Sequence, residues 1–190
     1  MTNRNQIECQ TLRECERCKG ITKAGGRCSR NTCLYADYCW QHTRSTRGLK
    51  IARSHIPRAG RGLFATKNHP AGTVIQYARD VDYVPFDELE RRYPGDTLAV
   101  YALCGTSRCY DARSTQSGLG RWINDPLHDP DQVNAVFMEN NVDQKPYIQL
   151  IRDVIKGEEI YASYGTEYWG GPSRTKTKSK SKSKRAARRR

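Results

Sequence analysis

The sequence predicts a mainly β fold with few short helices, flanked by a small cysteine-rich module at the N-terminus and a basic tail at the C-terminus. Three observations predict this arrangement. Short β-branched and aromatic runs alternate with Gly, Pro and Asn clusters through the middle of the chain. Six of the eight cysteines fall between Cys9 and Cys39, and ten Lys and Arg without any acid fill the residues from Arg174 to Arg190.

Shifts in composition divide the 190 residues into four parts. We expect a zinc-binding module over 1–43, a basic linker over 44–50, a catalytic-sized body over 51–171 and a disordered basic tail over 172–190. The tail alternates Lys with Ser and Thr, so it has no apolar surface whose burial would offset the entropy of ordering. A chain of this length builds one main core.

Strands are expected in the body wherever apolar β-formers lie between turn signals: 62–65, 73–77, 110–112, 135–138 and 147–151. A short helix is expected over 86–93, because the segment follows Pro85 and stops at Pro94. Residues 118–123 are expected to begin a second short helix. The body is therefore predicted to be β-rich.

Within the N-terminal module, three thiols and an imidazole have the composition of a structural zinc site. These are Cys18, Cys28 and the closely spaced pair Cys39 and His42. A four-ligand Cys₃His set is a standard structural zinc arrangement. So short a module, with few large apolar residues, would take most of its folding free energy from metal binding. Free reduced cysteines are the alternative.

The other cysteines leave the ligand set open. Cys15 and Cys33 are alternative ligands, whereas Cys104 and Cys109 stand apart and are expected to be core thiols. The sequence has no apolar run of 18 residues and no secretory signal, so we expect a soluble intracellular protein without membrane attachment. In a reducing compartment, crowded cysteines favour metal ligation over disulfides.

Two glycines, Gly60 and Gly62, precede a predicted strand, and their lack of a side chain would let a ligand approach the backbone. A simple bend at the start of a strand is the alternative. Further on, Asn124 follows the apolar pair Trp122 and Ile123, so its amide is expected to be partly buried and to need partners. The alternative is that Asn124 only forms a turn, together with the next residue, which also favours turns.

Three segments in this order resemble the SET-domain protein lysine methyltransferases: 58–65, 120–125 and 157–165. The resemblance covers roughly Gly48 to Trp169. No cysteine follows the last segment, where the family commonly carries a zinc-binding segment, so the chain resembles the short viral and other minimal members. An aromatic lid is expected to take the place of that segment.

The resemblance implies S-adenosylmethionine as cofactor and a set of residues that bind it: Gly60, Arg61, Gly62, Arg121, Asn124, Asp125, Tyr164 and Trp169. Asp125 stands where the family has histidine, a position expected to act mainly through its backbone groups. Trp169 is expected either to stack on the adenine or to pack at an edge. Structural zinc is the second expected cofactor.

The resemblance also implies catalytic roles for some of the tyrosines. Tyr164 matches the family's closing tyrosine and is the first candidate for catalysis, with Tyr101 and Tyr110 second. For any single tyrosine, ordinary packing is the alternative. Ala162 stands where relatives often carry the aromatic residue that limits the number of methyl groups, unless Tyr110 or Tyr161 fills that space.

Family and charge together predict a lysine methyltransferase of a protein, with a histone or nucleosome as substrate and a nuclear location, the host nucleus if the protein is viral. The tail is a candidate for non-specific DNA contact or nuclear import. A homodimer is possible. Two alternatives stay open: a zinc- and polycation-based nucleic-acid or chromatin-binding protein with a catalytically weak body, and a methyltransferase of a non-histone protein.

Overall fold

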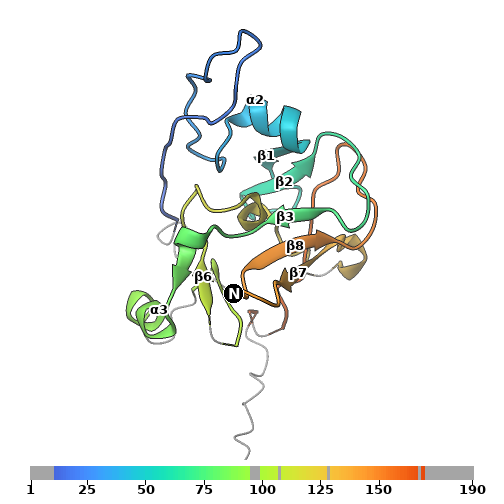
Figure 1. The fold of residues 1–190 in the computed structure, drawn as a ribbon. Helices are drawn as coiled ribbons and strands as arrows, with labels where there is room; N and C mark the ends of the chain where they lie inside the picture. Colours follow the sequence, from blue (N-terminus) through green and yellow to red (C-terminus); the bar gives the residue numbers. More distant parts are fainter. Residues whose placement is uncertain (1–10, 95–98, 107, 128, 167, 170–190) are drawn as a thin grey trace, which may run out of the picture.

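Short antiparallel strands form most of the regular structure in the computed structural model, which describes residues 11–94, 99–106, 108–127, 129–166 and 168–169 (Figure 1). The strands are β1 Leu49–Arg53, β2 Arg61–Ala65, β3 Val74–Gln76, β4 Tyr83–Val84, β5 Ala102–Cys104, β6 Cys109–Asp111, β7 Ala135–Glu139 and β8 Pro146–Leu150. All five predicted strands are present. The predicted mainly β fold is confirmed.

Helices are short and stand between the strands. They are α2 Trp40–His42, the π-helix η1 Thr43–Arg47, the 3₁₀-helices η2 Asp80–Asp82, η3 Leu119–Trp122 and η4 Pro130–Gln132, and α3 Phe86–Arg92. The helix predicted over 86–93 is α3, and the one predicted over 118–123 is a single 3₁₀ turn. None of the helices in the described ranges is long and apolar enough to cross a bilayer.

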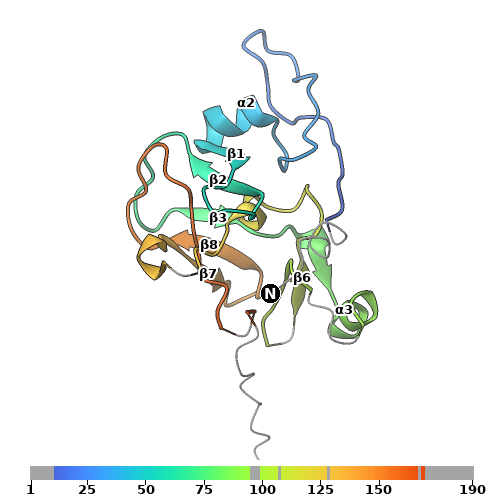
Figure 2. The same ribbon diagram turned by 180° about the vertical axis from the view of Figure 1, so that it is seen from behind.

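The strands pair into three small sheets, ordered β1-β2, β3-β8-β7 and β4-β6-β5, all antiparallel. Figure 2 shows them from behind, with the β4-β6-β5 sheet and α3 set to one side of the other two. The main core joins the sheets through fully buried aliphatic side chains, among them Leu63, Ile148 and Ile160. Burial of each such side chain stabilises the fold by about 1.5–3 kcal/mol.

The segment expected as a basic linker, 44–50, is structured instead. Its first half forms η1, and β1 begins at Leu49, before the expected start of the body. Leu49 and Ile51 are buried while Lys50 between them is exposed, which is the alternation of a half-buried strand. The Lys50 ammonium lies 5.6 Å from the centre of the Phe64 ring. The sequence pattern did not predict this strand because the residues on its exposed face are charged.

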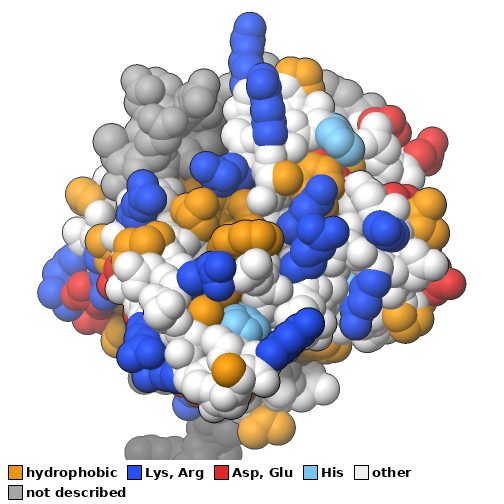
Figure 3. Space-filling model, turned by 90° about the horizontal axis from the view of Figure 1, so that it is seen from above, with side chains coloured by type: hydrophobic (Ala, Val, Ile, Leu, Met, Phe, Trp, Pro, Cys, Tyr) orange, Lys and Arg blue, Asp and Glu red, His pale blue; other side chains and the backbone are white. Residues whose placement is uncertain are grey.

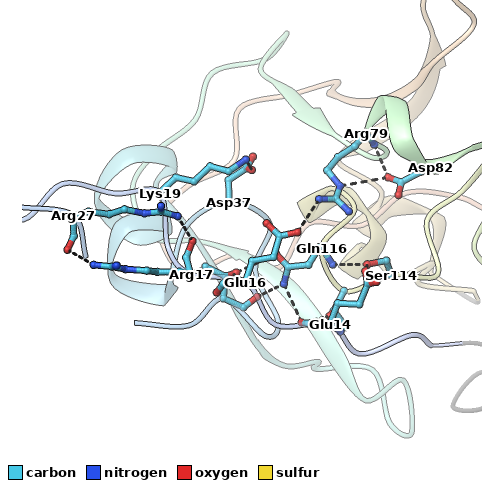
Figure 4. A network of polar contacts seen from close by, with 12 residues as sticks. Glu14, Glu16, Arg17, Lys19, Arg27, Asp37, Arg79, Asp82, Ser114 and Gln116 are labelled. Carbon is cyan, nitrogen blue, oxygen red and sulfur yellow. Dashed lines mark hydrogen bonds and ion pairs between the residues drawn. The ribbon is translucent and has the colours of Figure 1, made fainter. Parts of the chain in front are cut away.

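The N-terminal module docks on the body through polar contacts (Figure 4), beside Leu34 and Tyr35, which pack against the main core. The buried Gln116 side chain donates to the carbonyl oxygens of Glu14 and Thr32 and accepts from the Thr32 hydroxyl. The Ser114 hydroxyl donates to the Glu14 carboxylate, and Arg79 forms an ion pair with Glu16 at 3.5 Å. These contacts fix the module on the loop that precedes η3 and on Arg79, at the start of η2.

Four cysteines are paired in disulfides, which corrects the expectations for them. Cys15 bonds to Cys33, so neither belongs to the metal-ligand set. Cys104 bonds to Cys109 and is not a core thiol; the register of β5 and β6 places these two residues directly opposite each other. The expected disordered tail, 172–190, lies outside the described residues.

Candidate active site

The closing segment, residues 157–165, lies between two other parts of the chain that the sequence singled out. The Ala162 N–H donates to the Asn124 carbonyl at 3.0 Å, and the Ala135 N–H donates to the Tyr161 carbonyl at 2.9 Å. The buried Asn134 side chain binds the closing segment in both directions, donating to Glu159 O and accepting from the Tyr161 N–H. Three separate segments of the chain therefore meet here.

Tyr164 is held by both its backbone and its hydroxyl. The hydroxyl donates to the Ile123 carbonyl at 2.6 Å, and the ring lies 6.0 Å from that of Phe137. Burial raises the pKa of Tyr164 well above its ordinary value, and the neighbouring Tyr168 and Tyr77 raise it further. The hydroxyl is therefore neutral at physiological pH, with its proton committed to a carbonyl and its oxygen able to accept.

The buried carboxylate of Asp125 gathers three hydrogen bonds. Its Oδ2 accepts from the Tyr164 N–H at 2.7 Å and from Nε1–H of Trp169 at 3.0 Å, and its Oδ1 accepts from the Leu127 N–H at 2.7 Å. The expected contact with the cofactor, mainly through backbone groups at this position, stays a prediction. Within the protein, the side chain links the Asn124 segment to the C-terminal aromatic residues.

Trp169 lies parallel to Tyr164, with ring centres 6.0 Å apart and an interplanar angle of 7°. Tyr168 meets both rings edge-on at 4.8 Å. These three aromatic side chains form a cluster next to the closing motif, in the place where the sequence led us to expect a lid. Whether Trp169 also stacks on adenine stays a prediction.

Two hydrogen bonds donated by its nitrogen orient the side-chain amide of Asn124. Nδ2 donates to the Arg61 carbonyl at 2.9 Å and to Oε1 of Glu159 at 3.2 Å. In the described part of the chain no donor reaches its Oδ1, which is therefore available to a cationic or amine donor of a ligand. Arg61 contributes its backbone oxygen here, while its side chain is exposed.

Glu159, which the sequence reasoning missed, orients much of this site. Its buried carboxylate accepts from the Ser54 hydroxyl at 2.6 Å, the His55 N–H at 2.7 Å and the Tyr161 hydroxyl at 2.8 Å, besides Asn124. The one signal in the sequence was that this acidic residue begins an otherwise apolar run, 159–162. The hydroxyl of Tyr161 is thus engaged at Glu159.

The two turn glycines are required for different reasons. Gly60 has φ +80°, which favours glycine, and a Cβ built there would meet no atom within 4 Å. A Cβ at Gly62 would lie 1.9 Å from Oε1 of Glu159. Gly60 therefore faces open space that a ligand can enter, whereas Gly62 makes room for the carboxylate that orients Asn124.

Arg121 is buried and its guanidinium lies between two rings, 4.3 Å from the centre of Tyr101 and 4.4 Å from that of Trp122. Its Nε donates to the Ala112 carbonyl at 2.8 Å, and burial lowers its pKa. Arg121 therefore supports the wall that carries Tyr101, and its expected contact with the cofactor stays a prediction.

Tyr101 and Tyr110 are placed differently. Tyr101 is half-buried, its hydroxyl is 3.0 Å from the Thr11 hydroxyl, and its carbonyl accepts from the Tyr77 hydroxyl. Tyr77 connects it to the Tyr164 cluster, because Tyr77 packs edge-on against Phe137. Tyr110 is buried on β6 and its hydroxyl donates to the Asp143 carbonyl. Of these two tyrosines, Tyr101 has the closer link to Tyr164.

The four predicted metal ligands converge in the N-terminal module. The ligand atoms of Cys18, Cys28, Cys39 and His42 all lie within 4.8 Å of one another. His42 Nδ1 is 3.4 Å from the sulfur atoms of Cys18 and Cys39. These separations suit four ligands at about 2.0–2.3 Å from one tetrahedral ion.

Second contacts orient these ligands. His42 Nε2 lies 3.1 Å from the Ile21 carbonyl, which can only accept, so Nε2 carries the proton and Nδ1 is left free for a metal. The Cys18 sulfur accepts from the N–H groups of Gly20 and Cys39. The Arg30 backbone N–H lowers the pKa of the Cys28 thiol to about 7. The donor set therefore fits zinc.

Comparison with protein families finds that residues 60–165 match the SET domain, a region that holds the glycine turn, the Asn124 segment and the closing motif. The chain belongs to the SET-domain family. A comparison with curated proteins finds no match.

Solved structures similar to the chain include two polycomb assemblies. One is the Chaetomium thermophilum polycomb repressive complex 2, with 23% identity, a TM-score of 0.49, and coverage of 67% of this chain and 16% of that chain. Another is ctPRC2 in an autoinhibited conformation bound to S-adenosylmethionine, with 23% identity, a TM-score of 0.49, and coverage of 62% and 15%. The chain thus spans about a sixth of the length of these relatives.

Proposed function

We propose that this SET domain transfers a methyl group from S-adenosylmethionine to a lysine side chain of a protein, and that the protein is a histone. The observation that carries the proposal is the convergence of Tyr164, the oriented amide of Asn124 and the open space at Gly60. The histone substrate and a nuclear location rest on the family resemblance and the basic tail.

The reaction requires a neutral amine. A free lysine has a pKa near 10.4, so its deprotonation at pH 7 costs about 4–5 kcal/mol. An apolar aromatic site disfavours the charged ammonium and makes that step easier. Tyr77, Phe137 and Tyr164 supply such walls, since Phe137 contacts both tyrosine rings.

When bound, S-adenosylmethionine would supply an electrophilic methyl group for transfer to the neutral amine. Tyr164 contributes a neutral hydroxyl, whose oxygen can accept weak C–H contacts or a hydrogen bond from the amine, because its own proton is donated to Ile123 O. Asn124 offers Oδ1 to the amino group of a ligand. Asp125 holds Tyr164 and Trp169 in place.

We also propose that the Cys18, Cys28, Cys39 and His42 cluster binds one structural zinc ion. The three sulfur atoms are buried and the imidazole is oriented by Ile21, which supports a closed structural site rather than a catalytic one. The ion would hold together a module whose described residues form a single apolar cluster of their own, made of the three cysteines with Tyr38 against it.

The test is transfer of labelled methyl groups from S-adenosylmethionine to recombinant nucleosomes, to core histones and to a cell extract depleted of histones. Asn124→Ala is compared with Asn140→Ala, which removes an equal side chain from the exposed turn after β7. The proposal predicts histone labelling that is lost in Asn124→Ala and retained in Asn140→Ala. Labelling only in the histone-depleted extract would reject the histone substrate, and no labelling anywhere would reject the enzyme.

A further inference from the structure

Charge is distributed unevenly over the folded part of the chain. Residues 11–69 contain thirteen Lys and Arg against three Asp and Glu, whereas residues 70–169 contain nine against sixteen. The first part therefore carries a net charge of +10 and the second of −7. This asymmetry is separate from the basic tail, which begins beyond both parts.

The basic part occupies one side of the molecule. Residues 11–69 build the Cys/His module, α2, η1, β1 and β2, which stand together at the top of Figure 1. Figure 3 looks down on this side and shows Lys and Arg side chains spread across it, with acidic side chains mainly at the rim. We call this surface the basic face.

Most of these charges have no acidic partner. Among the thirteen cations in the described residues 11–69, only Lys19 has an ion pair, with Asp37 at 2.6 Å. Arg47 and Lys50 lie over the rings of Tyr38 and Phe64, which leaves their charges uncompensated. Like charges collected on one surface repel one another and attract a polyanion.

Two arginines on this face are fixed in advance. Arg17 donates through Nε to the Cys28 carbonyl at 3.0 Å and through Nη2 to the Arg27 carbonyl. Arg27 donates in return to the carbonyls of Cys18 and Arg17, both at 3.0 Å. Because the guanidinium groups are already ordered, an anion that binds them costs little side-chain entropy. Two of the acceptor carbonyls belong to Cys18 and Cys28, which are also proposed zinc ligands.

Apolar and recessed features accompany the charges. Trp40 is 52% exposed and Ile21 is 60% exposed within the same module. A recess of about 250 Å³ lies where the module meets β1 and β3, and Arg47 and Lys67 line it together with Asp37, which is paired with Lys19. A cationic surface with an exposed aromatic ring is typical of contact with nucleic acids.

We propose that the basic face binds the phosphate backbone of duplex DNA without regard to base sequence. Singly spaced cations over a broad surface match a rod of regularly spaced phosphates better than they match one acidic peptide. The acidic second part would keep DNA on the basic side. This inference goes beyond methyl transfer and does not depend on it.

The experiment measures binding of the full-length protein to a fluorescent 20-base-pair duplex between 50 and 200 mM salt. The test variant is Lys23→Gln, Arg44→Gln and Lys67→Gln, three exposed cations without an ion pair in the described residues. We expect weaker binding and a salt slope smaller by about 3, since each lost phosphate contact removes about 0.9 from the slope.

Two matched variants, each with three charges removed, separate this face from the rest of the chain. Arg108→Gln, Arg152→Gln and Lys156→Gln neutralise exposed cations of the acidic part and should leave the slope unchanged.

Lys176→Gln, Lys178→Gln and Lys180→Gln do the same in the tail, and binding through the basic face should persist in that variant. Thermal unfolding confirms that every variant is folded.

Three outcomes would overturn the proposal. In the first, the basic-face variant shows the same salt slope as the acidic-part variant. In the second, the tail variant alone loses all binding. In the third, a polyglutamate chain binds as tightly as the duplex, and its salt slope falls by the same amount in the basic-face variant, which would mean that the face binds an acidic protein.

Discussion

The carboxylate of Asp125 accepts a hydrogen bond from the indole of Trp169 at 3.0 Å, and through the same oxygen it accepts the backbone N–H of Tyr164. An aspartate thus joins the Asn124 segment to the aromatic residues that follow the closing motif. It stands where the family pattern has histidine. In this chain one side chain therefore fixes both the tyrosine proposed for catalysis and its aromatic neighbour.

Asp125→Asn should loosen this connection. Both carboxylate oxygens accept from N–H groups, so an amide of the same size must direct its NH₂ against a donor. We expect a loss of about 1–3 kcal/mol in the free energy of unfolding, measured by urea denaturation followed by tryptophan fluorescence.

A double-mutant cycle with Trp169→Phe tests whether the two residues act together. A coupling energy of about 0.5–3 kcal/mol is expected, since they are in direct contact. Additive losses would show that Trp169 is held independently of Asp125.

Substitution of the neighbouring residues Glu158 and Glu159 should change the free energy of unfolding by very different amounts. Glu159→Gln leaves Ser54, His55, Asn124 and Tyr161 with an imperfect acceptor in a buried position, so we expect the free energy of unfolding to fall by about 2–3 kcal/mol.

Glu158→Gln is the matched control, because that carboxylate is partly exposed, lies near Arg152 and accepts one backbone N–H, from Ile155, which an amide oxygen can still accept; the variant should lose well under about 1 kcal/mol. Equal losses for the two variants would refute the orienting role of Glu159.

Sequence patterns predicted those elements whose residues carry a local signal. β2, β3, β7 and β8 combine β-branched or aromatic residues with flanking turns, and α3 stands between two prolines. β1 was not predicted, because the basic residues at its exposed positions interrupt the apolar pattern. The role of Glu159 could not be predicted, since three of its four partners are 35 to 105 positions away in the sequence.

The candidate site was predictable to a similar degree. Tyr164, Asn124 and Gly60 were found through ordered motifs; the structure places Asn124 beside the closing segment, with its amide on the carbonyl of Arg61, next to Gly60. The contacts made by the Asp125 side chain were not, because they depend on where Trp169 returns in space. Cysteine pairing was likewise hidden: Cys15 and Cys33 are 18 residues apart, and nothing local distinguishes a disulfide from a ligand pair.

Purified protein should contain one zinc ion per chain, measured by elemental mass spectrometry after dialysis. Cys39→Ser removes a buried ligand atom and should abolish zinc retention. Cys33→Ser is the control, because Cys33 lies in a disulfide outside the cluster, and it should retain the ion. Full zinc in Cys39→Ser, or its loss in Cys33→Ser, would contradict the ligand set.

Stability should fall in alkaline solution. Burial raises the pKa of Tyr93 to about 12, and it also raises the pKa of Tyr77, Tyr161 and Tyr164 above the ordinary value. The unfolded chain releases these protons near pH 10, so above that pH the unfolded state binds fewer protons and unfolding becomes easier.

The stability present below about pH 10 should therefore be lost progressively towards pH 12 and beyond. Urea unfolding at successive pH values measures the loss, and Tyr93→Phe should reduce its slope. A free energy of unfolding that stays constant from pH 9 to pH 11.5 would contradict this prediction.

The most direct test of the proposed enzyme compares Tyr164→Phe with Tyr83→Phe, an exposed tyrosine on β4. The measurement is the single-turnover rate of methyl transfer to a histone substrate, together with the Kd for S-adenosylmethionine. We predict a rate about 100-fold lower in Tyr164→Phe, a barrier increase of about 2.7 kcal/mol, with cofactor affinity retained and the control unaffected. Transfer by Tyr164→Phe at the wild-type rate would contradict the account.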